Sequence, residues 1–219
     1  MRFLALLGKF LISVGVGVLL FVVWTLWGTG IQTEREQDKL TDVFAAQPDF
    51  PDHKPGENPG PPPGFKPLPG EPIFRLKIPA LRLNDNKGYL VVEGVDDDEL
   101  ALGPGHYPAC RPGFEPPLCT EFDEVYPGEE GRAIVSGHRT THGAPFWDLD
   151  KLDKGDEIIT ETKWGDFVYE VSRTEIVPAA STAIVVQKEG PAEIVLTTCH
   201  PKFSAAQRLI VYAEMTGLA

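Results

Sequence analysis

The feature that most constrains this chain is an uninterrupted apolar run near its N-terminus. Residues 10–31 contain no charged side chain. At about 1.5 Å rise per residue, a helix of this length spans a hydrocarbon layer of roughly 30 Å. A cleavable signal has a shorter apolar core of about 7–15 residues, followed by a small-residue cleavage site. The run therefore predicts a transmembrane signal anchor at 10–31, in preference to a buried core helix or a cleaved signal peptide.

The residues around this run predict its orientation. Arg2 and Lys9 precede it, whereas acidic residues soon follow it. Positive charge is retained on the cytoplasmic side of a membrane, and Trp24 and Trp27 are typical of an outer interface. We therefore expect a single-pass protein of the cell membrane, with residues 1–9 in the cytoplasm and all later residues outside the cell.

A linker is expected at residues 32–72. Residues 32–47 are polar and fit a short helix or a stalk, whereas residues 48–72 contain ten prolines and four glycines. Proline has no backbone N–H and favours extended conformations, so such a stretch forms a semi-rigid spacer. The linker is predicted to hold the folded domain, residues 73–219, away from the lipid surface.

Charge excludes one large class of partner. The chain has 20 basic and 32 acidic residues, a net charge of −12, and nucleic-acid binding needs a cationic surface. Residues 93–130 alone carry eleven acids and one base. Clustered carboxylates can bind calcium, but these do not follow the spacing of an EF-hand loop. A solvated acidic face is the preferred interpretation, and no cofactor or metal is expected.

The remaining sequence predicts an all-β domain. Short β-branched runs separated by turn signals are typical of a barrel or a sandwich. Residues 104–130 read as loop, residues 144–152 as a short helix, and residues 96–103 as a helical turn capped by Asp96. Strands are expected at 73–83, 88–95, 131–138, 156–162, 166–177, 182–187, 193–199 and 208–215.

Three residues at predicted strand ends carry groups suited to acyl transfer. Cys199 and His138 each close a strand, and Arg208 opens the last one. A thiolate attacks a carbonyl, a histidine moves protons, and a guanidinium can stabilise the oxyanion of a tetrahedral intermediate. We therefore predict Cys199 as nucleophile, His138 as general acid and base, and Arg208 as oxyanion stabiliser.

Three motifs in the expected order resemble those of the sortases, the membrane-anchored cysteine transpeptidases of Gram-positive bacteria. They are LGPGHYP at 102–108, GHRTTHGAPFWDLDKLDKGDEI at 137–158 and LTTCHPKFSAAQRLIVYA at 196–213. The second and third look most like the class E, housekeeping type. The resemblance implies a closed eight-stranded barrel over roughly residues 73–216. It also implies an active site of His138, Cys199 and Arg208.

The resemblance also implies a reaction and its partners. An exported protein with an LPxTG-like signal near its C-terminus, LAxTG in class E, would be cut between Thr and Gly through a thioester on Cys199. An amine of a peptidoglycan precursor would then take the acyl group and anchor the protein to the cell wall. Membrane lipid is the remaining expected partner, because the anchor would hold enzyme and substrates at one surface.

The resemblance assigns further residues to the substrate groove, namely Tyr107, Thr197, Thr198 and His200. His200 and His142 depart from the residues common in the family. Separately, Cys110 and Cys119 lie nine residues apart in a predicted outer loop, so a disulfide between them is reasonable in an oxidising compartment. That pairing would leave Cys199 as the free thiol.

Four alternatives remain open at this point. A zinc site would draw on His138, His142, Cys199 and His200, although glycines bracket the HRTTH segment and argue against a zinc-binding helix. An L,D-transpeptidase would place its arginine much nearer to the cysteine. A thiol peptidase would share the acylation step and use water as acceptor. A non-catalytic surface module would use the acidic barrel as a binding platform.

Overall fold

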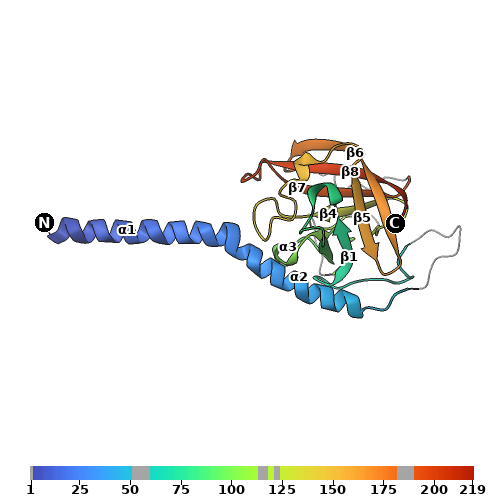
Figure 1. The fold of residues 1–219 in the computed structure, drawn as a ribbon, viewed down its shortest axis with the longest axis horizontal. Coiled ribbons are helices and arrows are strands. Elements are labelled where there is room, and N and C mark those ends of the chain that lie inside the picture. Colours follow the sequence, from blue (N-terminus) through green and yellow to red (C-terminus); the bar gives the residue numbers. More distant parts are fainter. Residues whose placement is uncertain (1, 51–59, 113–117, 121–123, 182–189) are drawn as a thin grey trace.

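The chain folds as a long N-terminal helix joined to a β-barrel (Figure 1). This computed structural model describes residues 2–50, 60–112, 118–120, 124–181 and 190–219. The helical part consists of α1 (Arg2–Val23), a π-helical turn η1 (Trp24–Gly28) and α2 (Thr29–Ala46). The 42 residues from Ala5 to Ala46 contain an apolar stretch long enough to cross a membrane.

The barrel is closed and has eight strands in the order β1-β2-β3-β4-β7-β8-β6-β5, which confirms the predicted architecture. Its strands are β1 (Pro72–Lys77), β2 (Tyr89–Glu93), β3 (Gly105–His106), β4 (Arg132–Ser136), β5 (Glu157–Thr162), β6 (Gly165–Pro178), β7 (Glu193–His200) and β8 (Gln207–Leu218). Short helical elements join some of them, namely η2 (Pro79–Leu81), α3 (Asp97–Leu102) and η3 (Leu149–Lys151).

Strands β7 and β8 are covered on both faces, which explains their continuous apolar sequences. Leu196 and Leu209 belong to the large cluster that fills the barrel, whereas Val195 and Ile210 belong to a second cluster on the other face. Strands buried on both faces lack the alternation of half-exposed strands. β7 pairs in parallel with β4 and antiparallel with β8, so three strands converge at the barrel end where β7 finishes.

Local predictions agree with the structure in part. Asp96 caps α3 by accepting a hydrogen bond from the Asp97 backbone N–H, as predicted. The helix expected at 144–152 is only the single 3₁₀ turn η3. β3 was missed, because two residues inside a loop rich in proline and glycine carry no periodic signal. The strand expected at 182–187 lies outside the described residues.

Of the short helix or stalk expected at residues 32–47, the structure shows the helix, and this helix, α2, docks on the barrel. Gln37 is buried, and its amide donates to the carbonyls of Leu90 and Leu102 while its oxygen accepts the Leu90 N–H. Thr33 is buried as well and donates to the carbonyl of Ala101. These four hydrogen bonds tie α2 to β2 and to the end of α3.

The Pro-rich segment, where it is described, also packs on the barrel rather than acting as a spacer. Phe65 makes edge-to-face contacts with Tyr126 and Trp164, at ring-centroid distances of 5.2 and 5.3 Å. The carbonyl of Pro67 accepts a hydrogen bond from Arg111. Proline lacks a donor but keeps its apolar ring and its carbonyl, so a Pro-rich chain can still be buried. The domain boundary predicted at residue 73 therefore falls inside a packed unit.

Candidate active site

Cys199 and Arg208 lie side by side at one end of the barrel. Their Cα atoms are direct partners in the antiparallel pairing of β7 with β8. Such partners have Cβ atoms about 4.5–5.5 Å apart, so a long guanidinium reaches the surroundings of the sulfur. The Arg208 Nη1 donates to the carbonyls of Ala205 and Gln207, each at 3.2 Å. Cys199 is half-buried and carries a free thiol.

The backbone just before His138 is bound to the strand that carries the cysteine. The Gly137 N–H donates to the Thr197 carbonyl at 3.1 Å, and the Thr198 hydroxyl donates to the Gly137 carbonyl at 2.7 Å. A Cβ atom at Gly137 would lie 2.7 Å from ring carbons of Phe146, so the close approach requires glycine here. These contacts hold the His138 loop against the last residues of β7.

His138 and Cys199 face the same surface cavity of about 380 Å³. The cavity is formed by the loop after β4 and the turn between β7 and β8. Its lining consists of His138, Arg139, Thr140, Thr141, Cys199, Phe203, Ser204 and Ala205. The structure therefore brings the three residues predicted for acyl transfer to one end of the barrel, although they are far apart in the sequence.

The His138 ring is electrically neutral near neutral pH. Burial lowers its pKa to about 4, the neighbouring His142 contributes in the same direction, and the carboxylate of Asp97 opposes them. The His138 and His142 rings stack with centroids 4.6 Å apart. Nε2 of His138 is buried and has no hydrogen-bond partner among the described residues. A neutral imidazole with a free nitrogen is suited to accept a proton.

Of the residues assigned to the groove, Tyr107 lies near the guanidinium. Burial raises the pKa of its hydroxyl and the Arg208 charge opposes that shift, so the two side chains are within electrostatic reach. Thr197 and Thr198 are buried, and Thr198 is engaged with Gly137 as described above. His200 is half-buried. In the described part of the chain, these four residues do not line the 380 Å³ cavity, and their contact with substrate stays a prediction.

The sequence did not single out Arg139, which is buried at the cavity with 2 % exposure. Its guanidinium contacts Asp150 at 2.7 Å, and its Nε donates to the Trp147 carbonyl at 2.9 Å. The side chain thereby fixes the segment after His138. The sequence signal that could have found Arg139 is its position directly after His138. A single arginine is, however, ordinarily interpreted as a surface residue.

The predicted disulfide is present, since Cys110 and Cys119 are bonded to each other. The zinc alternative gains nothing from the geometry. Across the residues described above, no group of three or more His, Cys, Asp or Glu side chains is arranged to hold a metal ion.

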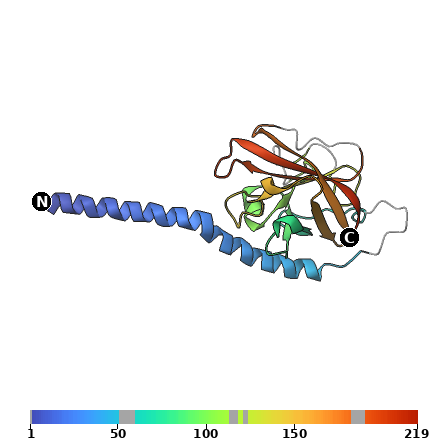
Figure 2. The ribbon, with the colours of Figure 1, turned by 45° about the horizontal axis from the view of Figure 1, so that its top comes forward.

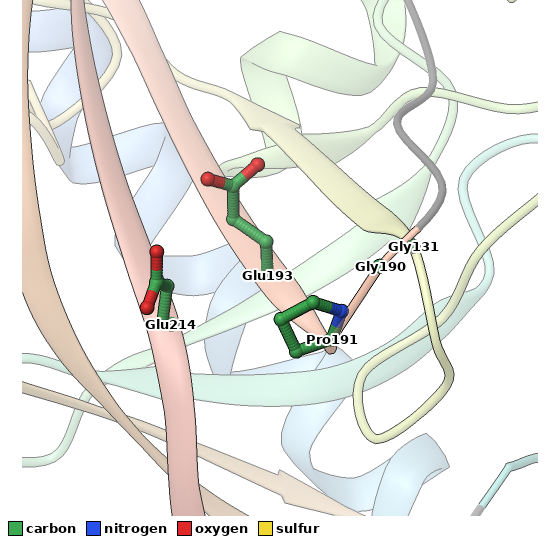
Figure 3. Close-up of a pocket in the computed structure, with 5 residues that line it drawn as sticks. All are labelled: Gly131, Gly190, Pro191, Glu193 and Glu214. Carbon is green, nitrogen blue, oxygen red and sulfur yellow. The ribbon is translucent and has the colours of Figure 1, made fainter.

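A second, very small cavity lies at the opposite end of β7 (Figure 3). Its volume of about 10 Å³ offers room for about one water molecule. Glu193 and Glu214 border it from directly paired positions of β7 and β8. Arg132 contacts Glu193 at 2.6 Å and offsets the repulsion between the two carboxylates. This cavity is too small for a substrate, and it is separate from the cysteine.

Comparison with known proteins agrees with this geometry. The sequence model of the sortase domain family matches residues 76–216. The chain is 35 % identical over 154 residues to Sortase D of Bacillus subtilis, which covers 68 % of this chain and 67 % of that protein. It is 32 % identical over 219 residues to Sortase SrtE1 of Streptomyces coelicolor, which covers 95 % of this chain but only 56 % of that protein.

Solved structures show the same fold. The crystal structure of Sortase E1 from Streptomyces coelicolor with a tripeptide in its active site aligns with a TM-score of 0.55 at 28 % identity, covering 70 % of this chain and 93 % of that one. The SrtF sortase from Corynebacterium diphtheriae aligns with a TM-score of 0.58 at 28 % identity, covering 74 % and 93 %. This chain therefore belongs to the sortase family of cysteine transpeptidases.

Proposed function

We propose that this protein is a membrane-anchored sortase of the class E type that joins exported proteins to the cell wall. Its substrate would carry an LAxTG- or LPxTG-like signal, cut between Thr and Gly, and its acceptor would be an amine of a peptidoglycan precursor. The observation that carries this proposal is that Cys199 and His138 line one cavity. Arg208 is the residue paired with Cys199 on the neighbouring strand β8.

The arrangement supports a double-displacement reaction. Nε2 of neutral His138 accepts the Cys199 proton as the sulfur attacks the Thr carbonyl, and the Arg208 guanidinium stabilises the resulting oxyanion. The C–N bond then breaks, and the imidazolium returns its proton to the leaving Gly amine. The thioester is attacked by the acceptor amine, which loses a proton to His138, and the thiol is restored when the tetrahedral intermediate collapses.

The position in the cell is part of the same proposal. The apolar helix would cross the membrane once with its N-terminus in the cytoplasm, so the barrel would lie outside. Arg2 and Lys9 before the run support this orientation, since positive charge is retained on the cytoplasmic side. Anchoring would hold the enzyme beside an exported substrate and a lipid-linked amine.

The deciding experiment is mass spectrometry of the purified full chain with LAxTG and LPxTG peptides, each with and without candidate amines. We expect an acyl-enzyme on Cys199 and an amine adduct of the peptide. Hydrolysis of the peptide at the same rate with and without amine, and with no amine adduct, would instead identify a thiol peptidase. No cleavage of either peptide would contradict the proposal.

Two substitutions assign the roles. Cys199→Ala should abolish the acyl-enzyme, because no other group in the cavity supplies a thiolate; unchanged function would indicate a non-catalytic surface module. Arg208→Lys should impair cleavage strongly, since an ammonium ion cannot copy the planar guanidinium. Arg35→Lys, an exposed exchange on α2, is the matched control and should leave the rate unchanged.

A further inference from the structure

The loop that carries His138 touches the chain at the end of the apolar run. The backbone N–H of His142 donates to the Thr29 hydroxyl at 3.1 Å. A Cβ atom at Gly30 would lie 3.4 Å from backbone atoms of Gly143. Since the uncharged run ends at Ile31, the active-site loop lies level with the point where a membrane-spanning helix would leave the lipid.

The docking of α2 fixes how the barrel is oriented relative to that point. Gln37 and Thr33 are buried and bonded to β2 and α3, so the barrel cannot turn freely about the end of α1. In both Figure 1 and Figure 2, the turn between β7 and β8 lies at the end of the barrel nearest α1. The catalytic end is thus directed toward the apolar helix.

An exposed aromatic pair occupies this same end. Phe203, in the β7–β8 turn, is 68 % exposed and Trp147 is 38 % exposed, and their rings meet edge to face at 5.7 Å. The Lys202 Nζ lies 4.3 Å from the Trp147 ring centroid. Phe203 has a φ of +64°, a backbone conformation that is costly for a bulky residue. Strained residues of this kind cluster at functional sites.

We infer that Trp147 and Phe203 insert into the headgroup region of the outer leaflet, so that the active-site cavity opens at the lipid surface. Tryptophan at membrane interfaces, and lysine whose charged end reaches the headgroups, are typical of such contacts. The inference rests on α1 spanning the membrane, as proposed above. Asp96, Asp97, Asp98 and Glu99 lie near this end, so insertion of aromatic rings, and not attraction to anionic lipid, drives the contact.

The arrangement has a consequence for the substrates. Phe203 lines the catalytic cavity as well as the exposed patch, so the mouth of the cavity would adjoin the lipid. A sorting signal and an amine that are both held at the membrane surface would then reach Cys199 by lateral diffusion. Neither substrate would need to leave the membrane surface to reach the cavity.

Depth-dependent quenching of a label tests the inference without using activity. The full chain carrying Cys199→Ala is reconstituted in phosphatidylcholine vesicles, and an introduced cysteine carries a nitrobenzoxadiazole fluorophore. Phe203→Cys reports the patch. Leu218→Cys, which replaces a 70 % exposed apolar residue at the far end of β8, is the matched control. Leu20→Cys, within α1, reports whether the anchor is inserted.

Nitroxide-labelled phosphatidylcholine should quench the label at position 203 at least threefold more than the label at 218, and should also quench the label at 20. Quenching at 20 but not at 203, or equal quenching at 203 and 218, would overturn the inference and leave the anchor intact. Absence of quenching at 20 would overturn both. Ala205→Cys, exposed in the same turn, gives a second measurement if Phe203→Cys does not fold.

Discussion

Two histidines of this barrel, the half-buried His138 and the buried His106, have opposite properties. His138, beside the cysteine, has a pKa lowered to about 4, and its Nε2 lacks a hydrogen-bond partner in the described structure. His106, on β3, is 1 % exposed, and its ring nitrogens lie 3.0 Å from a Glu93 carboxylate oxygen and from the Val125 carbonyl. The pKa of His106 is raised. Burial alone therefore does not decide the charge of a histidine.

The partners of the two rings explain the difference. A carbonyl can only accept, so the His106 Nε2 carries a hydrogen, and the Arg111 guanidinium at 3.2 Å favours the ionised form of Glu93. Burial lowers the pKa of His106, but the Glu93 charge and hydrogen bond outweigh it. His138 has another histidine as its stacked neighbour, which adds to the effect of burial. The His106 ring is hydrogen-bonded into the fold, whereas Nε2 of His138 has no partner among the described residues.

The largest effect should follow from changing the free ring. His138→Gln should reduce kcat/KM for peptide cleavage by about two to four orders of magnitude, the usual worth of a general acid–base group. The free energy of unfolding should change by less than about 1 kcal/mol, because little bonding is lost. Peptide cleavage and urea denaturation measure the two quantities. A large loss of stability would mean that His138 is also part of the fold.

Changing His106, the ring paired with Glu93, should affect stability and leave catalysis intact. His106→Leu leaves the Glu93 carboxylate buried without its histidine, which should cost about 3–5 kcal/mol of unfolding free energy. The kcat of the folded fraction should stay unchanged. Adding Glu93→Gln to this variant should recover part of the stability, because it removes the uncompensated charge. A lowered kcat with normal stability would show that His106 acts on the chemistry through its neighbour Tyr107.

The disulfide next to this cluster should have a smaller effect. Cys110→Ser combined with Cys119→Ser should lower the free energy of unfolding by about 2–3 kcal/mol, since the bridge constrains the unfolded chain. Arg111 directly follows Cys110 and contacts Glu93. Loss of the bridge should therefore also loosen the contacts that Glu93 makes with Arg111 and His106. Cleavage by the folded enzyme should persist. Loss of kcat at unchanged stability would place the bridge in the active site instead.

The sequence located His138 and Cys199, because they lie at or just beyond the ends of two strands with strong apolar patterns, β4 and β7. Their roles in the chemistry stay a prediction. Gly137 and the two threonines before the cysteine lie within the same motifs, and they supply the contacts that hold the loop to β7. Local sequence therefore marked both candidate groups and part of their support.

The rest depends on contacts that no local pattern reveals. His106 lies on a two-residue strand, and its role comes from Glu93 on another strand and Val125 in a loop. Gln37 resembles any polar residue of an exposed helix until the barrel satisfies its amide. The prolines indicate a segment without helix or strand, and residues 60–71 form turns instead. Whether this segment lies free or packs on Tyr126 and Trp164 is decided by tertiary contacts.

The finest comparison of the two histidines is their titration by NMR. The His138 ring signal should titrate near pH 4, whereas the His106 signal should titrate above about 6.5, the ordinary value. The effects on stability have opposite signs. Between about pH 6.5 and 4, His138 binds a proton in the unfolded chain but not in the folded protein. His138 therefore destabilises the fold as the pH falls through this range. The stabilising contribution of His106 is complete below about 6.5 and is lost as the pH rises through its folded pKa. Titration of both rings at the same pH would remove the distinction, and with it the argument that an acidic partner reverses the effect of burial on a histidine pKa.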